Sequence, residues 1–530
     1  MQVELVLLVL SLLFFVSIVA DKIGYKFGVP ALLLFLAVGM LFGPDGIGAL
    51  VGGEGVNIDT GSAEALSTLA LCIILFSGGM DTKFGDIKAV LAPGIMLATI
   101  GVLITCLLTG VILYFLFGWF DAVVSVSLSF ALLTAATMSS TDSASVFSIM
   151  RTHHIGLKHD LRPLLELESG ANDPMAYVLT TTLIGVVLSQ SASVEIWPIV
   201  QTVVIQLVMG TVLGLVLGKG LIQVMRRVQL GNDALYPIMV LTACIFIFSI
   251  TYYLKGNTYL AVYVGGLVIG NSKFSRKRQT KAFFNGLTWL SQLVMFLMLG
   301  LMVRPSELLQ LQVLLPCLII SIVMIFISRP ATVWLCMLPF KRYHQRDKIM
   351  LSWVGLKGAV PIIFAIMCKA EGVAQADMLF NVIFLCTIVS LLIQGTTLTQ
   401  VAHKLDLATP PVEENKLEYF DLELPEDVES TAREVEVTPE LLVSGNTPRE
   451  LQIPPHTLIV MVRRGEDFFI PTGSSELQSG DWLLVISDHD ATAAYRHITD
   501  EAEEDAVWRE QMREKAKAHL RKATAWMHKK

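Results

Sequence analysis

At 530 residues the chain is longer than one ordinary soluble domain, and 54% of its residues are hydrophobic while only 16% are charged. Together with a mean hydropathy of +0.63, this composition indicates a polytopic membrane protein and argues against one large soluble core. The net charge of −7 is uneven, because residues 405 to 530 are rich in charge and almost free of long apolar runs. The last quarter is therefore predicted to be a soluble unit.

The first apolar run, Met1 to Ala20, is interpreted as a retained membrane span. No basic residue precedes its apolar stretch, and Asp21 and Lys22 follow it, whereas a cleaved signal peptide carries its positive charge in front. All seven cysteines lie in apolar segments without paired spacing. This pattern favours buried single thiols over a disulfide or metal framework.

The sequence predicts 13 membrane spans, because runs of about 20 apolar residues can cross ~30 Å of hydrocarbon. The ninth run is the shortest. The runs begin near Val3, Pro30, Ser62, Val90, Val123, Leu161, Ile196, Ala234, Thr258, Phe284, Leu309, Lys348 and Asp377.

The distribution of positive charge supports this number of spans. Of the 24 Lys and Arg residues up to position 403, 19 fall in six alternate loops and three in the opposite loops, and Arg329 and Lys357 lie within spans. Positive residues gather on the cytoplasmic side of membrane proteins. We therefore expect the N-terminus outside and the C-terminal unit in the cytoplasm, in a plasma (cell inner) membrane.

Polar stretches interrupt three of the predicted spans. Span five contains TAATMSSTDSASVF with Thr141 and Asp142, span six contains LELESGANDPMAY, and span twelve contains WVGLKGAVP with Lys357. Hydroxyl runs, paired glycines and proline weaken a continuous helix. Transporters place such interrupted helices in corresponding positions of two repeats, where freed backbone groups bind ions.

Span six carries the strongest candidate for an ion site. Ser169 and Asp173 are four residues apart and share a helix face, as do Glu168 and Asn172. Carboxylate, amide and hydroxyl oxygens suit an alkali cation, and Pro174 leaves the Gly170 carbonyl without its helical partner. Asp173 can hold either a proton or a cation, which is the minimum required for exchange. The alternative is that Asp173 only makes a hydrogen bond between helices.

Glu168 and Lys357 are predicted to pair across spans six and twelve, because their opposite charges offset each other in a medium where either alone is costly. Structural roles are favoured for Glu166 and Arg329. His153 and His154 are interpreted as solvated loop residues, with pH sensing as the alternative.

The motifs TDSASVF, ESGANDP, GLKGAVP and LIQGTTL resemble those of the NhaP-type monovalent cation:proton antiporters. The resemblance implies an all-α polytopic membrane fold with inverted repeats and broken helices, and a homodimer whose six-helix core moves. It implies that Asp173 is the carrier carboxylate, with Asn172, Ser169, Asp142 and Thr141 in or beside the ion site. No further metal is expected beyond the transported cation.

Two positions depart from the family pattern. Lys357 stands where Arg is common, which weakens a purely structural interpretation of the pair with Glu168. Ser77 stands where relatives often have an acidic residue, and one fewer charge could favour potassium over sodium. An Asn-Asp pair such as Asn172 and Asp173 resembles the electroneutral members.

The domains are predicted as a transmembrane antiporter domain at 1–404, a linker at 405–420, a regulatory domain at 421–490 and a charged helical tail at 491–530. The segment TLIVMVRRGEDFFIPTGSSELQSGDWLLVIS predicts short strands around an RRGED turn. This cytoplasmic α+β domain resembles the TrkA-C module, which implies dimerisation and a small regulatory ligand such as a nucleotide or cyclic dinucleotide. A passive dimerisation role is the alternative, and no cofactor is expected.

The sequence therefore predicts a transporter and not an enzyme, exchanging cytoplasmic K⁺ or Na⁺ for external H⁺. A sodium-coupled solute carrier and a ligand-gated cation transport protein are the alternatives. A K⁺-channel filter such as TVGYG and an HExxH metalloprotease motif are both absent from the sequence. No nucleic-acid partner is expected.

Overall fold

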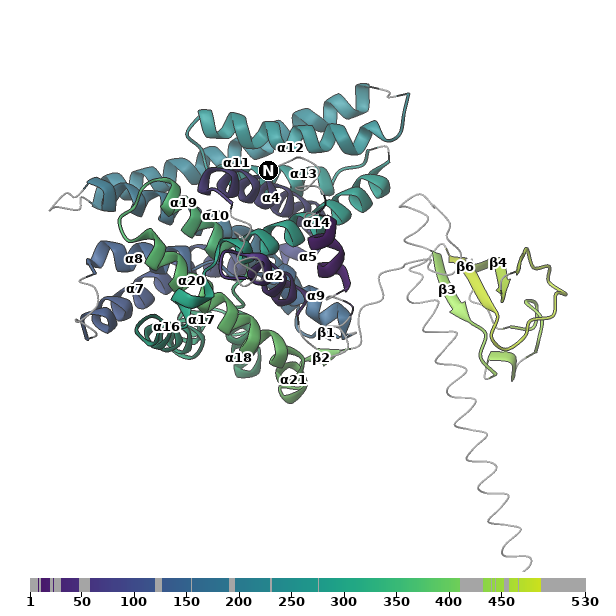
Figure 1. Ribbon diagram of the computed structural model, residues 1–530. Coiled ribbons are helices and arrows are strands. Elements are labelled where there is room, and N and C mark those ends of the chain that lie inside the picture. Colours follow the sequence, from purple (N-terminus) through teal and green to yellow (C-terminus); the bar gives the residue numbers. More distant parts are fainter. Residues whose placement is uncertain are drawn as a thin grey trace, which may run out of the picture. The chain divides into compact units, whose positions relative to one another are not determined.

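The computed structural model describes residues 8, 11–19, 22, 30–46, 58–119, 126–153, 155–189, 196–228, 231–274, 276–409, 432–439, 441–443, 445–451, 457–465 and 467–487. The chain divides into two compact units, Met1–Pro411 and Val412–Lys530. Helices build the first unit, and a small sheet lies in the second (Figure 1). Of the first predicted span, residues 8 and 11–19 are described, and the whole predicted tail lies outside the described residues.

The helices of the first unit begin within about three residues of most of the predicted starts from Pro30 onward. The exceptions are the helix predicted near Val123, which begins at Leu128, and the helix predicted near Phe284, which begins at Lys277. In Figure 1, α11 and α12 run along one side of this unit, while α16, α18 and α21 lie on the opposite side. The helices are α2 (Ala31–Phe42), α4 (Thr60–Asp81), α5 (Phe84–Lys88), α6 (Leu91–Met96), α7 (Val102–Trp119), α8 (Leu128–Thr137), α9 (Ser143–Thr152), α10 (Leu161–Ser189), α11 (Ile196–Arg227), α12 (Leu235–Tyr253), α13 (Thr258–Gly270), α14 (Lys277–Met302), α15 (Pro305–Leu308), α16 (Leu311–Val323), α17 (Arg329–Cys336), α18 (Gln345–Trp353), α19 (Val360–Ala370), α20 (Ala376–Ser390) and α21 (Thr396–Lys404).

Eight helical segments in the described part of the chain are long and apolar enough to cross a membrane. Their lengths of 19 to 29 residues match the thickness of a hydrocarbon core. Three of the eight join two helices through a π-helical turn, at Leu97–Gly101, Met324–Ser328 and Leu391–Gly395. Four shorter apolar helices accompany them, α2, α8, α13 and α19. The fold is thus a mostly helical polytopic membrane fold, and the total of 13 spans stays a prediction.

Small residues let the helices α4 and α13 pack backbone against backbone. A Cβ atom at Gly266 would overlap the carbonyl of Phe76, and one at Gly270 would overlap the carbonyl of Met80. Without water to exclude, membrane helices gain their association energy from such close contact. This explains why the short helix α13 is glycine-rich.

Two predicted interruptions are confirmed. Residues 138–142 separate α8 from α9, and residues 354–359 separate α18 from α19. The hydroxyl of Thr137 donates to the carbonyl of Thr134 at 2.7 Å, and that of Ser139 donates to the carbonyl of Ala136 at 2.6 Å. These side chains satisfy carbonyls at the end of α8, so the helix can stop inside the apolar layer.

The predicted interruption of span six is wrong, because α10 runs unbroken through Pro174. Proline removes one backbone donor and so leaves the Gly170 carbonyl without its helical partner, but the helix continues past it. At this turn the side chain of Asn257, which caps the start of α13, donates to the carbonyl of Pro174 itself at 2.8 Å. The residues of ESGANDP therefore lie on one continuous helix, α10, which Asn257 contacts at Pro174.

The described part of the second unit is a four-stranded antiparallel sheet of order β3-β6-β4-β5. Its strands are β3 (Ala432–Glu436), β4 (Thr457–Arg464), β5 (Asp467–Phe469) and β6 (Trp482–Ser487). The predicted strands on either side of the RRGED turn and after SGD are confirmed, with Gly465 at φ 61° in the turn. The apolar core of the sheet includes Val435, Val462, Leu477 and Leu483.

Candidate ion-binding site

The carrier candidate Asp173 lies deep in the helical unit, on the continuous helix α10. Its side chain is 7% exposed, and Glu168, Ser169 and Asn172 on the same helix are also buried. The hydroxyl of Ser140 donates to the Asp173 Oδ1 atom. The interruption between α8 and α9 therefore supplies a direct contact to the carboxylate.

Four of the predicted ion-site residues meet where α10 passes the first interruption. The Ser169 hydroxyl donates to the Thr141 carbonyl at 2.8 Å, and Asn172 Nδ2 donates to Thr141 Oγ1 at 2.5 Å. The Asn172 Oδ1 atom is buried and has no hydrogen-bond partner within the described part of the chain. A buried acceptor of this kind, next to Asp173, is a suitable ligand for a hard cation.

Asp142 is brought to the same place but its carboxylate acts as a helix cap. Its Oδ1 accepts from the backbone N–H of Ser145 at 3.0 Å, and its Oδ2 accepts from the Ser145 hydroxyl. These contacts satisfy free donors at the start of α9. A Cβ atom at position 358 would overlap the Asp142 carboxylate, so Gly358 allows the two interruptions to touch.

The two interrupted helices are joined by direct hydrogen bonds at their breaks. The Asp142 N–H donates to the Leu356 carbonyl at 2.9 Å, and Lys357 Nζ donates to the Ser140 carbonyl at 2.8 Å. Because Ser140 also contacts Asp173, one residue connects the Lys357 amine with the Asp173 carboxyl group. The site thus brings an acidic and a basic side chain together between two unwound segments.

The predicted ion pair between Glu168 and Lys357 is corrected by the structure. Among the described residues, Glu168 pairs with Arg329, whose Nη1 lies 2.5 Å from Glu168 Oε1, and not with Lys357. Arg329 begins α17 directly after a π-helical turn, and its Nη2 also donates to the Leu351 carbonyl at 3.2 Å. The planar guanidinium serves both acceptors, whereas the ammonium of Lys357 donates to the Ser140 carbonyl. Gly355 makes room, because a Cβ there would lie 2.8 Å from Arg329 Nε.

Two residues that hold the second interruption were not singled out from the sequence. The Ser390 hydroxyl accepts from the Lys357 N–H at 3.0 Å, and Gln394 Nε2 donates to the Trp353 carbonyl at 2.8 Å. Ser390 also donates to Gln394 Oε1 at 2.6 Å. The signal available was a glutamine inside the apolar run LIQGTTL.

Other residues considered in the sequence take peripheral positions. Glu166 is half-buried and pairs with Arg162, four residues earlier, at 3.0 Å. Ser77 is buried in α4, and its part in ion choice stays a prediction. His154 lies outside the described residues.

A small cavity of about 10 Å³ lies at the second interruption, and its lining includes Arg329, Lys357 and Gln394.

Comparisons with known proteins agree with this arrangement. The family described as "Sodium/hydrogen exchanger, transmembrane" matches residues 8–404, and the TrkA-C domain matches residues 432–499. The chain is 37% identical to a protein of Alkalimonas amylolytica named K(+)/H(+) antiporter NhaP, over 91% of this chain and 78% of that one. It is 35% identical to K(+)/H(+) antiporter NhaP2 of Shewanella sp. (strain ANA-3), over 93% and 83%.

A solved structure supports the fold. The sodium proton antiporter MjNhaP1 from Methanocaldococcus jannaschii superposes with a TM-score of 0.63 at 22% identity, covering 76% of this chain and 99% of that one. With the family match extending over three quarters of the sequence and two interrupted helices meeting at their breaks beside a buried carboxylate, the chain belongs to the sodium/hydrogen exchanger family, with a TrkA-C domain after its transmembrane part.

Proposed function

We propose that the protein exchanges cytoplasmic K⁺, or Na⁺ as the second choice, for external H⁺ by alternating access. The observation that carries the proposal is Asp173, buried beside the unpartnered Asn172 Oδ1 and in contact with Ser140 at the crossing of the interrupted helices. Asp142, Thr141 and Ser169 complete the proposed ion site. The K(+)/H(+) names of the relatives at 37% and 35% identity support potassium.

The coupling follows from charge. An ionised carboxylate in the apolar layer is costly, so an empty and charged Asp173 opposes the movement of the core. With either a proton or a cation bound, the carboxylate is neutral and the core moves. Because the Glu168–Arg329 pair is neutral as a unit, it adds no charge to the moving part. One proton for one cation makes the exchange electroneutral.

Further parts of the proposal concern architecture. We infer 13 spans with inverted repeats, the N-terminus outside and the C-terminal unit in the cytoplasm of the cell inner membrane, and a homodimer. The proposed division is a transmembrane domain at 1–404, a linker at 405–420, a regulatory domain at 421–490 and a charged helical tail at 491–530. The TrkA-C match supports the regulatory role, and a nucleotide or cyclic dinucleotide is the proposed ligand, with no cofactor needed for transport.

The decisive experiment is ion-triggered dissipation of a preformed ΔpH in proteoliposomes, with K⁺ and Na⁺ tested separately. Wild type should collapse ΔpH with K⁺, and Asp173→Asn should abolish this flux, because an amide can neither release a proton nor offset a cation's charge. Asp377→Asn is the matched control, since that carboxylate is exposed, lies at the start of α20 and forms its ion pair with Lys369.

Three outcomes would contradict the proposal. Flux that persists in Asp173→Asn removes the carrier role from this residue. If neither cation collapses ΔpH, a sodium-coupled solute carrier becomes the leading alternative, and Na⁺-dependent solute uptake is then the next measurement. Cation flux that proceeds without proton movement would indicate a ligand-gated cation transport protein.

A further inference from the structure

The chain leaves the helical unit through a segment that is tied to the start of the carrier helix. Strand β2 (Ala408–Thr409) pairs antiparallel with β1 (Gly156–Leu157), which directly precedes α10. The Lys158 N–H also donates to the Leu407 carbonyl at 3.0 Å, and Leu407 is 2% exposed. Any displacement of Ala408–Thr409 therefore acts on the segment that leads into α10.

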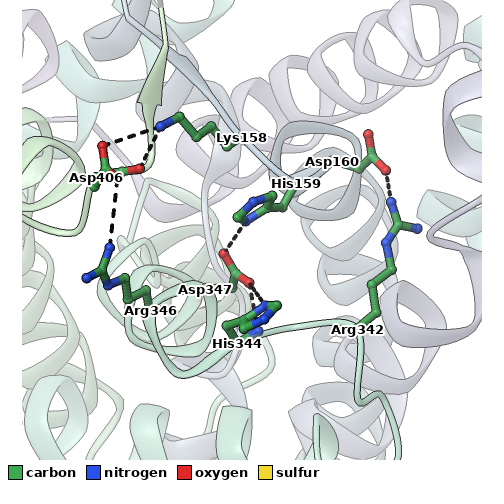
Figure 2. A network of polar contacts seen from close by, with 8 residues as sticks. All are labelled: Lys158, His159, Asp160, Arg342, His344, Arg346, Asp347 and Asp406. Atoms are coloured by element: carbon green, nitrogen blue, oxygen red, sulfur yellow. Dashed lines mark hydrogen bonds and ion pairs between the residues drawn. The ribbon is translucent and has the colours of Figure 1, made fainter.

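Asp406 strengthens this connection through two ion pairs. Lys158 Nζ lies 3.0 Å from the Asp406 carbonyl and 3.4 Å from its carboxylate, and Arg346 Nη1 lies 3.8 Å from the other carboxylate oxygen. Lys158 precedes α10, whereas Arg346 lies in the first turn of α18. One aspartate at the exit of the chain thus contacts the starts of both helices (Figure 2).

A second aspartate, Asp347, is buried and also connects the starts of α10 and α18. Asp347 is 1% exposed, and its Oδ1 lies 2.9 Å from Nδ1 of His159. Its Oδ2 accepts from the His344 N–H at 2.8 Å and forms the capping box of α18. Figure 2 shows Asp347 between the two histidines, with Arg342 reaching Asp160 beside them.

The two helices connected in this way carry the exchange site. Asp173 lies 12 residues beyond Leu161 along the unbroken α10, about 18 Å at 1.5 Å per residue. The interruption with Lys357 follows directly after α18 ends at Trp353. Rigid helices transmit a displacement of their ends, so a shift at Asp406 reaches both halves of the site.

We propose that Asp406 and Asp347 are positioning residues of a junction, made of residues 156–160, 342–347 and 406–409, through which the C-terminal unit regulates exchange. The inference rests on the proposed function and names its route of regulation. Since unit two begins at Val412, a conformational change there acts on the chain just after β2. The junction passes that change to α10 and α18 together.

The first test uses Asp406→Asn in the full chain, reconstituted in proteoliposomes. This change removes the charge that attracts Lys158 and Arg346 and leaves the β1–β2 pairing in place. We expect the maximal exchange rate to fall about fivefold, the lower end of typical couplings between sites, with the apparent KM for the cation unchanged. Hydrogen exchange should become faster at the amide of Lys158. Asp377→Asn, equally exposed and also paired with a lysine, should behave as wild type.

The second test asks whether the C-terminal unit acts through the junction. A flexible insertion of about ten Gly and Ser residues after Thr409 loosens the connection without removing either unit. In the wild-type background it should lower the rate by the same factor as Asp406→Asn. In the Asp406→Asn background it should add nothing, because the route is already interrupted.

The outcomes separate this inference from the proposed function. If wild type exchanges and Asp173→Asn does not, but Asp406→Asn matches Asp377→Asn in rate and hydrogen exchange, the junction has no role. If the insertion does not change the exchange rate of the wild type, the route through Asp406 is overturned. The same holds if the insertion lowers the rate of Asp406→Asn further. Absence of exchange in the wild type rejects the proposed function itself.

Discussion

Each unit of the molecule buries one carboxylate against an arginine, and the two pairs are built differently. In the C-terminal unit, Arg464 Nε and Nη2 contact the two oxygens of Asp481, each at 2.8 Å. In the membrane unit, Arg329 contacts Glu168 through one oxygen, at 2.5 Å. Both carboxylate side chains are 2% exposed, so burial alone does not separate them.

The difference lies in how completely the polar atoms are satisfied. Asp481 also accepts from the Gln478 N–H at 2.8 Å, whereas Glu168 Oε2 and Arg329 Nε are buried without hydrogen-bond partners among the described residues. A bidentate and fully bonded pair fixes one geometry. An incompletely bonded pair inside a membrane is a costly feature, and it lies beside the two interrupted helices. The first pair fixes the fold of the sheet, whereas the second lies in the part of the protein that we propose to move during exchange.

Glu168→Gln should produce the largest effect, because it leaves the Arg329 charge buried without an anion. Breaking one partner of a buried ion pair costs about 3–5 kcal/mol, which should lower the thermal unfolding midpoint in detergent and abolish exchange. The double variant Glu168→Leu with Arg329→Met removes both charges and should recover most of the stability. If Glu168→Gln were as stable as wild type, the Glu168–Arg329 pair would not contribute to the stability of the fold.

Asp481→Asn should cost less, about 1.5–3 kcal/mol for lost hydrogen bonds to a charged group, and only in the C-terminal unit. Burial raises the pKa of the Asp481 carboxyl, but the hydrogen bonds from Arg464 and Gln478 outweigh this, so the net pKa is lowered. The stabilisation is therefore complete above the unfolded value of about 3.9 and is lost as the pH falls through the lower folded pKa.

Unfolding of the C-terminal unit followed against pH checks this prediction. Wild type should lose stability below about pH 3.9, and Asp481→Asn should lose part of this dependence while the membrane unit unfolds as before. Identical pH profiles for the two proteins would mean that Asp481 is not held in its charged form. Asp467→Asn, at the first residue of β5, provides a control for loss of one carboxylate from the same unit.

Lys357→Met should have the smallest effect on stability, within about 1.5 kcal/mol, the net value of one hydrogen bond. The reason is that Lys357 donates to the Ser140 carbonyl, and Glu168 keeps Arg329 when the lysine is removed. Thermal unfolding of this variant beside Glu168→Gln makes the comparison direct. A loss as large as that of Glu168→Gln would restore Lys357 as the partner of Glu168.

Much of the fold was predictable because its signals are local. Apolar runs mark the helices, and the hydroxyl run at Thr137–Thr141 and the glycines around Lys357 mark the two interruptions. Spacing along span six indicated Asp173, Ser169 and Asn172, and the family resemblance added Thr141. The structure brings these four residues together. Their transport roles stay predictions until the flux experiments are done.

Sequence by itself determined where most of the membrane helices form, where two of them break and which polar groups they bury, since hydropathy and helix-ending residues act within a few positions. Only the tertiary structure decided which cation meets which anion. Arg329 and Lys357 are both buried cations in the sequence, but a π-helical turn and the space at Gly355 bring Arg329 to Glu168, while Lys357 reaches Ser140. Likewise, Asn257 on another helix supports α10 at Pro174. Such pairings depend on contacts between segments distant in the chain, which no local pattern specifies.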